Sequence, residues 1–125
     1  MRRDDDLIRK LMLDLEQATS RISNSHAVEG YTQQEVAYHL ALIVKSGLAE
    51  GPKPIYPSDG SDPTVPLAVM ITRLTPEGHD FIADLRDDAV WEKVKERTAK
   101  VGGSVSLELL KQLATAVVKQ MLSFP

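Results

Sequence analysis

The stretch from residue 31 to residue 85 constrains the fold more than any other part of the chain. It opens with a predicted helix over 32–46, in which apolar residues recur at three- and four-residue spacing. Thr32 and Glu35 have the spacing of a capping box, which marks the start of this helix. Gly47 is typical of the residue that follows a helix end. The stretch therefore begins with a well-delimited amphipathic helix.

Two candidate strands follow this helix, at 49–56 and 67–74, and a segment rich in Pro, Asp and Gly connects them. Thr75 and Pro76 then predict the start of another helix, because threonine is a favoured cap and proline fits the first helical position. Helix, β-hairpin and helix in this order are typical of winged-helix domains. We therefore predict an α+β fold with a winged helix-turn-helix-like core, in which the hairpin is the wing.

The region before this core predicts one helix and little else. Apolar residues at helical spacing predict a helix over 4–19, and three aspartates at its start suit the helix dipole. The polar segment 20–30 has little helical pattern, so the second helix of a helix-turn-helix is expected to be short or missing. We expect a single short strand near 26–28 instead.

Two further helices are predicted after the core. One covers 89–100, and a glycine pair separates it from a final helix that Ser104 or Ser106 caps and that ends near residue 122. At 125 residues the chain is short enough for one compact domain. We divide it into a winged-helix-like core over 1–86 and a C-terminal helical extension over 87–125.

Composition excludes several classes of function. The chain has no cysteine, which excludes disulfides, zinc-thiolate sites and thiol nucleophiles. No segment approaches the ~20 apolar residues of a membrane span, and the N-terminus lacks a signal-peptide pattern. We therefore expect a cytoplasmic protein with no membrane partner. The formal net charge of −3 argues against strong unspecific binding to nucleic acid, which needs clustered Lys and Arg.

Motifs of catalysis and metal binding are missing from the sequence. Neither a G-x-S-x-G nucleophile turn nor a phosphate loop is present. Glu35 and His39 share a helix face, as paired metal ligands do, but no third ligand has a suitable spacing. A capping glutamate and a surface or half-buried histidine explain the pair more simply. We expect a protein that is not an enzyme, with no catalytic residue, no metal and no cofactor.

The polar face of the helix over 32–46 is the candidate DNA-reading surface. Glutamine amides can pair with adenine, and basic side chains on the helix end and the wing can meet phosphates. The candidate DNA contacts are Gln33, Gln34, Tyr38, His39, Lys45, Lys53 and Arg73. This helix carries a single lysine against one glutamate, and DNA-contacting helices are usually more basic. Ordinary surface polarity therefore stays open as an explanation.

The final helix has a broad apolar face, wider than one packing surface needs. Such a face packs either on the core or on a second copy of the chain. The candidate dimer-interface residues are Leu107, Leu110, Ala114, Val117 and Met121. We therefore expect a homodimer, with packing inside a single copy as the alternative.

Several segments together resemble a known family. They are R-R-D-D-D-L-I-R-K-L-M-L at the start, G-Y-T-Q-Q-E-V-A-Y-H-L-A-L-I-V-K-S-G-L-A-E-G in the middle, L-T-P-E-G-H-D-F-I-A-D-L-R-D-D-A-V-W-E-K-V-K after the wing, and G-G-S-V-S-L-E-L-L-K-Q-L-A near the end. The chain resembles the bacterial and phage family called domain of unknown function 2513. The resemblance implies a short winged-helix protein, often encoded in a phage or prophage, without an assigned catalytic residue. The long proline-rich wing, 52–66, leaves open whether its tip reaches a DNA groove.

Two hypotheses for function follow. The first is a small non-enzymatic regulator that binds double-stranded DNA through the helix at 32–46 and the wing at 49–74, of phage or prophage origin. The alternative is a protein-interaction module on the same scaffold, an inhibitor or adaptor acting on a host or phage protein. DNA binding predicts strong salt dependence, whereas protein binding predicts reliance on exposed apolar and aromatic residues.

Overall fold

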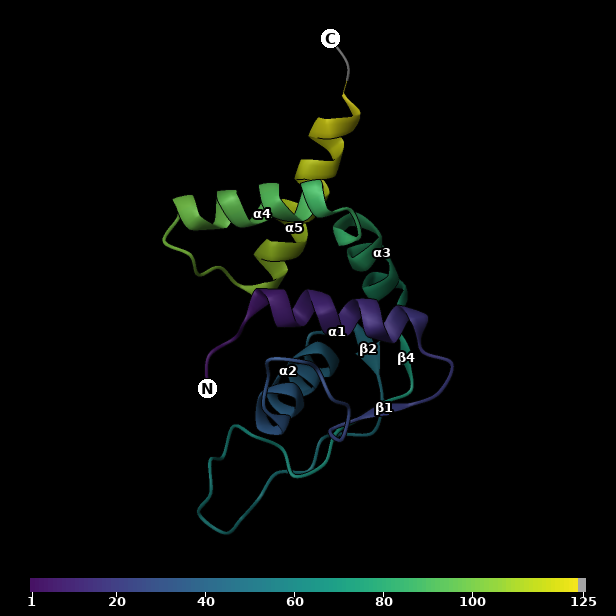
Figure 1. The fold of residues 1–125 in the computed structure, drawn as a ribbon, viewed down its shortest axis with the longest axis vertical. Coiled ribbons are helices and arrows are strands. Elements are labelled where there is room, and N and C mark those ends of the chain that lie inside the picture. The colour runs from purple at the N-terminus through teal and green to yellow at the C-terminus, as the bar shows by residue number, and fades with distance from the viewer. Residues whose placement is uncertain (124–125) are drawn as a thin grey trace. The chain divides into compact units, whose positions relative to one another are not determined.

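The computed structural model describes residues 1–123, which form five helices and two small antiparallel sheets (Figure 1). This content confirms the predicted α+β class. The chain divides into two compact units, Met1–His79 and Asp80–Pro125. None of the helices within residues 1–123 has the length and apolar character needed to cross a membrane.

The first unit begins with α1, Asp5–Gln17. Asp4 caps it, because its side chain accepts a hydrogen bond from the Leu7 N–H, and Asp5 and Asp6 occupy the first turn, where the helix dipole favours negative charge. One face of α1 is buried along its whole length: Leu7, Ile8, Leu11, Met12 and Leu15. The periodicity in the sequence predicted this helix and this face correctly.

The short strand β1, Ile22–Ser23, lies earlier than predicted. Ile22 is buried and pairs with Ile71, so a distant residue selects the position of this strand. The expected strand near 26–28 is wrong, because the chain turns there: the His26 N–H donates to the Ser23 carbonyl at 2.9 Å. No helix forms between residues 18 and 32 of the described chain, as the weak helical pattern predicted.

Helix α2, Gln33–Lys45, has the predicted capping box: the Thr32 hydroxyl accepts from the Glu35 N–H at 3.1 Å, and Glu35 accepts from the Thr32 N–H at 2.9 Å. Gly47 follows the helix with a φ of +77°, a conformation that side-chain-bearing residues rarely adopt. The buried face is wider than the predicted stripe and comprises Val36, Ala37, His39, Leu40, Ala41 and Ile43.

Three more strands complete the sheets: β2 (Ala49–Glu50), β3 (Met70–Ile71) and β4 (Arg73–Leu74). β1 pairs with β3, and β2 pairs with β4, both antiparallel. β3 and β4 are separated by Thr72 alone, whose N–H donates to the Glu50 carbonyl at 2.8 Å. The chain over 70–74 therefore has β1 on one side and β2 on the other.

Regular pairing in the hairpin is shorter than the predicted strands at 49–56 and 67–74. Pro52 and Pro54 have no N–H to donate, which limits ladder formation in the first strand. Pairing resumes at a single bridge between Ile55 and Ala68, where the Ile55 N–H donates to the Ala68 carbonyl at 2.9 Å. Residues 56–67 connect the two sides of this bridge, and we call them the wing loop.

Helix α3, Pro76–Leu85, starts where the sequence predicted. The Thr75 hydroxyl accepts from the Gly78 N–H at 3.0 Å and donates to the Gly47 carbonyl at 2.6 Å. A Cβ on Gly78 would lie 1.9 Å from the carbonyl oxygen of Leu48, so only glycine permits this close approach. The start of α3 is thereby held against the chain that leaves α2.

The second unit contains α4, Asp88–Lys100, and α5, Leu107–Leu122, which cross each other (Figure 1). Asp87 caps α4 and Ser106 caps α5. Both helices bury one face, made of Val90, Trp91, Val94 and Thr98 in α4 and of Leu110, Ala114 and Val117 in α5. Trp91 is thus a core residue, as expected.

Candidate binding groove beside helix α2

A groove lies between the N-terminal half of α2 and the wing loop, with a volume of about 520 Å³. Figure 1 shows the wing loop descending from the sheets beside α2. The lining is mixed, with apolar side chains, amides and one carboxylate: Met1, Asn24, Thr32, Gln33, Gln34, Ala37, Pro57, Ser61, Asp62, Val65, Pro66 and Leu67. The groove therefore offers apolar contact together with hydrogen-bonding groups, a combination typical of recognition sites.

A second hollow of about 460 Å³ lies between the C-terminal half of α2 and the same loop. It is lined by Tyr38, Ala41, Leu42, Lys45, Tyr56, Pro63 and Thr64. The Lys45 ammonium lies 4.4 Å from the centroid of the Tyr56 ring, a cation–π contact that joins the end of α2 to the start of the wing loop. The wing loop thus faces α2 along most of the helix.

Two alanines make room for this arrangement. Ala37 and Ala41 lie one turn apart on α2, and each is 3% exposed although it contributes to a hollow shared with the loop. A larger side chain at either position would fill the space between helix and loop. The small residues therefore account for the depth of the groove, and the sequence alone did not identify them as part of a site.

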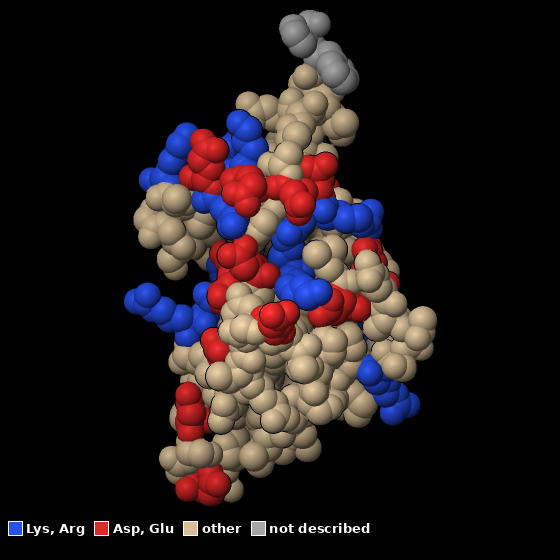
Figure 2. All heavy atoms as spheres, in the orientation of Figure 1, with Lys and Arg blue, Asp and Glu red and all other residues tan. Residues whose placement is uncertain are grey.

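The wing loop is acidic. Asp59 and Asp62 are exposed, and the face in Figure 2 shows red and no blue side chains at the wing-loop end. Hydrogen bonds from Ser61, first through its hydroxyl, lower the pKa of Asp59, and hydrogen bonds from Thr64 do the same for Asp62. Both carboxylates therefore stay ionised well below neutral pH.

The charge of the whole first unit is also negative. Residues 1–79 contain eight Lys and Arg against eleven Asp and Glu, a formal charge of −3, whereas residues 80–125 contain seven of each and are neutral. The net negative charge of the chain thus belongs to the unit that holds the groove. A phosphate backbone would meet repulsion here unless local basic groups outweighed it.

Four of the predicted DNA-contact residues lie on the groove side of α2. Gln33 and Gln34 are exposed and line the first hollow, so their amides are accessible to a ligand. Tyr38 and Lys45 line the second, where Tyr38 is half-buried and Lys45 stacks on the wing-loop tyrosine. The structure brings these four together, although in a groove shared with an acidic loop.

The other basic candidates lie apart from the groove. Arg73 is exposed on β4 and forms an ion pair with Glu50 at 2.9 Å, which neutralises its charge locally. Lys53 is exposed on the proline-rich segment after β2 and lines neither hollow. Fewer of the predicted basic DNA contacts therefore lie beside the groove than the sequence suggested.

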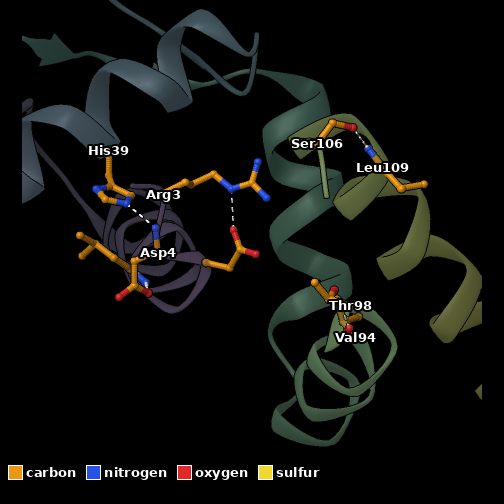
Figure 3. A network of polar contacts seen from close by, with 9 residues as sticks. Arg3, Asp4, His39, Val94, Thr98, Ser106 and Leu109 are labelled. Atoms are coloured by element: carbon orange, nitrogen blue, oxygen red, sulfur yellow. Dashed lines mark hydrogen bonds and ion pairs between the residues drawn. The ribbon is translucent and has the colours of Figure 1, made fainter. Parts of the chain in front are cut away.

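His39 does not belong to the exposed face, which corrects its prediction as a DNA contact. It is 1% exposed, and both ring nitrogens already have partners: Nδ1 lies 2.7 Å from the Glu35 carbonyl oxygen, and Nε2 accepts from the Asp4 N–H at 2.7 Å (Figure 3). The N-terminal residues cover this side of α2, so the helix buries a wider arc than its apolar stripe predicts. No group of the ring is left for a base or a phosphate.

The Glu35–His39 pair has a structural role in this fold. The Glu35 carboxylate accepts from the Thr32 N–H in the capping box, and His39 is enclosed as described. Within residues 1–123, no three His, Asp or Glu side chains are grouped in a way that could hold a metal ion.

The predicted dimer interface on α5 also needs correction. Leu110, Ala114 and Val117 are fully buried inside a single copy of the chain, so they are not available to a partner. The width of the apolar stripe predicts an interface but does not show which part of the stripe packs inside one copy. Leu107 is half-buried, and Met121, at 46% exposed, lies one turn beyond the buried part of the stripe.

Part of the groove lining was not predicted at all. Asn24, Asp62 and Val65 reach the groove from the β1 turn and the wing loop, far from α2 in sequence. Asn24 also stabilises the hairpin. Its Nδ2 donates to the Leu67 carbonyl at 3.3 Å, and its Oδ1 accepts from the Val69 N–H at 3.3 Å. The sequence marks these positions as turns and does not show which face of α2 they approach.

Comparison with other proteins supports the resemblance seen in the sequence. An uncharacterised protein of Haemophilus influenzae is 31% identical over 126 residues, which cover 98% of this chain and 100% of that protein. No solved structure matches. The family model described as "Hypothetical protein (DUF2513)" matches residues 2–104, and the chain belongs to this family.

Proposed function

We propose that this chain is a non-catalytic protein-interaction module, in which the groove between α2 and the wing loop takes up a segment of a partner protein. The observation that carries the proposal is the groove itself: about 520 Å³, lined by apolar side chains, two exposed glutamine amides and one carboxylate. Glutamine amides can bond the backbone of an extended peptide, and the apolar floor can bury a side chain.

The chemistry of the lining favours a segment that carries an apolar side chain next to a cationic one. Val65, Pro66 and Ala37 supply apolar contact, and Asp62 supplies a charge that stays negative at physiological pH. Charge complementarity mainly sets the choice of partner and the rate of association. An acidic partner would meet repulsion from both Asp59 and Asp62.

The scaffold that we propose for this module is a winged helix. The pairings β1–β3 and β2–β4 support it, because they put the returning strand of the hairpin between β1 and β2. The wing then emerges beside α2, the position of a recognition helix. The helix that normally precedes the recognition helix is replaced here by the turns between 24 and 32.

DNA binding remains the second candidate, and the same placement of wing and helix favours it. Gln33 and Gln34 are exposed on α2, and Lys53 is exposed on the wing side. Against it stand the buried His39, the Arg73–Glu50 ion pair and the two aspartates of the wing loop. The two exposed aspartates of the wing loop favour a protein partner over the phosphates of DNA.

The test is a selection from a library of random octapeptides against the intact protein, followed by anisotropy measurements on the selected peptides. We expect the selected sequences to combine Arg or Lys with an aliphatic residue or Met. A duplex of about 20 base pairs of random sequence, titrated at several salt concentrations, tests the other candidate, since phosphate contacts give a slope of about −0.9 per contact. Selection of acidic peptides, or of none, would overturn the proposal.

A matched pair of variants locates the binding site. Gln34→Arg adds a positive charge to the groove, and Gln112→Arg adds the same charge to an exposed glutamine on the outer face of α5. We expect Gln34→Arg to weaken the selected peptides by up to about fivefold at low salt, as an exposed charge pair does. Equal affinities for the two variants would place binding elsewhere, and tighter binding of DNA by Gln34→Arg alone would favour the second candidate.

A further inference from the structure

The first four residues of the chain lie beside α2 and reach the groove. The Met1 side chain is part of its lining, together with Gln33 and Asp62. The chain itself thus puts an apolar side chain where the proposed partner segment would place its own.

At its other end the segment is held through Asp4, whose N–H bonds to the buried side chain of His39. The Asp4 N–H donates to His39 Nε2 at 2.7 Å, and the Asp4 carboxylate accepts from the Leu7 N–H and from the Tyr31 hydroxyl, both at 3.1 Å. Figure 3 shows His39 pointing from α2 towards the Asp4 nitrogen. Met1 is 46% exposed, so its side chain lines the groove without being enclosed.

The fastening requires a neutral histidine. The partner of Nδ1 is the Glu35 carbonyl oxygen, which only accepts, so Nδ1 carries the proton. Nε2 then accepts from the Asp4 N–H. A second proton, on Nε2, would face this N–H donor, and the hydrogen bond that ties the segment to α2 would be lost.

The groups around the His39 ring have opposite effects on its pKa. Burial lowers the pKa of His39, and it outweighs the Glu35 carbonyl and the carboxylates of Asp4, Glu35 and Asp5, which raise it. Arg3 is a basic residue of the same segment, and its Nε donates to Asp5 at 2.7 Å. The edge of the Tyr38 ring, with its centroid 5.2 Å from that of His39, closes another side.

We propose that residues 1–4 form a strap that neutral His39 holds against the groove, and that protonation of His39 releases this strap. The role of the groove as a binding site rests on the function proposed above, but the release itself does not. The strap then competes with a partner segment at neutral pH and yields the groove at mildly acidic pH. Asp59 and Asp62 remain ionised over this range, so the groove keeps its affinity for cations.

The size of the effect follows from the difference between the two states of the strap. In the open state His39 is in contact with water and has an ordinary pKa of about 6.5, whereas the closed state resists protonation. The ratio of open to closed strap therefore rises by up to about tenfold for each pH unit below 6.5. Above pH 7 the ratio is constant.

Nuclear magnetic resonance of the intact protein tests the release without any ligand. The readout is the protection of the Asp4 amide hydrogen against exchange, relative to an unstructured chain, between pH 7.5 and pH 5. We expect a loss of protection of about tenfold per pH unit below 6.5, with Asp4 less protected at every pH than Leu11 and Leu40, because strap release needs less free energy than the global unfolding that exposes the core amides. His39→Gln keeps a neutral acceptor and should show a flat profile. His26→Gln removes a histidine that is partly exposed and bonded to Asp14, and should behave as wild type.

The titration of the wild-type protein alone tests strap release, even if a variant does not fold. An Asp4 protection factor that stays constant while the His39 ring titrates overturns the strap, and so does a ring proton on Nε2 at pH 7.5. Affinity of the selected peptides separates this proposal from the preceding one. Strap release with no rise in peptide affinity on acidification contradicts the competition with a partner. Loss of discrimination between Gln34→Arg and Gln112→Arg contradicts the groove itself.

Discussion

Helices α2 and α5 look alike in sequence and differ in what they present. Both start at a hydroxyl cap and bury an apolar face, and the sequence predicts a binding role for each, from the polar face of α2 and from the apolar face of α5. In α5 the centre of the apolar stripe, Leu110, Ala114 and Val117, is buried inside one copy of the chain. In α2 the core face is flanked by two alanines, beyond which lies the groove shared with the wing loop. Small residues beside the buried stripe thus accompany a surface hollow in α2, whereas extra apolar width in α5 does not leave the centre of its stripe exposed.

The largest expected effect tests whether the α5 stripe is buried inside one copy of the chain. Val117→Asp buries a carboxylate without a partner and should lower the free energy of unfolding by about 3 kcal/mol or more. Met121→Asp, one turn later on the same stripe but 46% exposed, should change it by no more than about 0.5 kcal/mol. Urea titration followed by circular dichroism measures both.

The opposite result would restore the predicted dimer. A Val117→Asp protein of normal stability but smaller mass in analytical ultracentrifugation would show that the residue faces a second copy. Met121→Asp serves here as a second probe, because a dimer through the end of α5 would lose mass with this variant alone.

The next effect concerns how α2 is fixed at its C-terminal end. Gly78→Ala forces a Cβ to within 1.9 Å of the Leu48 carbonyl oxygen, so the backbone must shift. We expect a loss of about 2 kcal/mol, since the overlap outweighs the better helix propensity of alanine. Glu77→Ala, at the neighbouring exposed position, is the control and should be nearly neutral. Equal midpoints in urea for these two variants would contradict the close packing.

Features that depend on neighbours in sequence were predictable, and features that depend on distant partners were not. The caps at Thr32, Thr75 and Ser106 are local hydrogen-bond patterns, and the helices start where these patterns predict. β1 is a two-residue strand whose place is chosen by Ile71, so its own segment carries little signal. The helix periodicity of α2 could not reveal that the N-terminal residues cover His39.

The candidate site divides in the same way. The sequence identified the exposed glutamines of α2, because a helix pattern fixes which residues share a face. It did not identify Asp62 and Val65, because a twelve-residue connection leaves the direction of the wing loop free. The sequence therefore could not show that the wing loop adds the carboxylate of Asp62 to the groove.

The pH dependence of stability tests the burial of His39 in α2, which has no counterpart in the buried face of α5. Burial holds the pKa of His39 below its ordinary value, so the unfolded chain binds a proton that the folded chain does not. This contribution to stability is complete above about pH 6.5 and is lost as the pH falls towards the folded-state pKa, with a slope of at most about 1.4 kcal/mol per pH unit. Urea midpoints at pH 7.5 and 5.5 should differ less in His39→Gln than in wild type or His26→Gln. A larger difference between the two midpoints in His39→Gln than in wild type would contradict the prediction that His39 lowers stability at acidic pH.

The smallest effect compares the two caps directly. Thr32→Ala and Ser106→Ala each remove one hydrogen bond, from Glu35 N–H at 3.1 Å and Leu109 N–H at 3.0 Å, and each should cost about 1 kcal/mol. Their consequences for binding differ, because α2 begins inside the groove and α5 does not line it. The side-chain amide resonances of Gln33 and Gln34 should therefore shift in Thr32→Ala and stay fixed in Ser106→Ala. Equal shifts in both variants would mean that the two helix starts are coupled, and the contrast between α2 and α5 would fail.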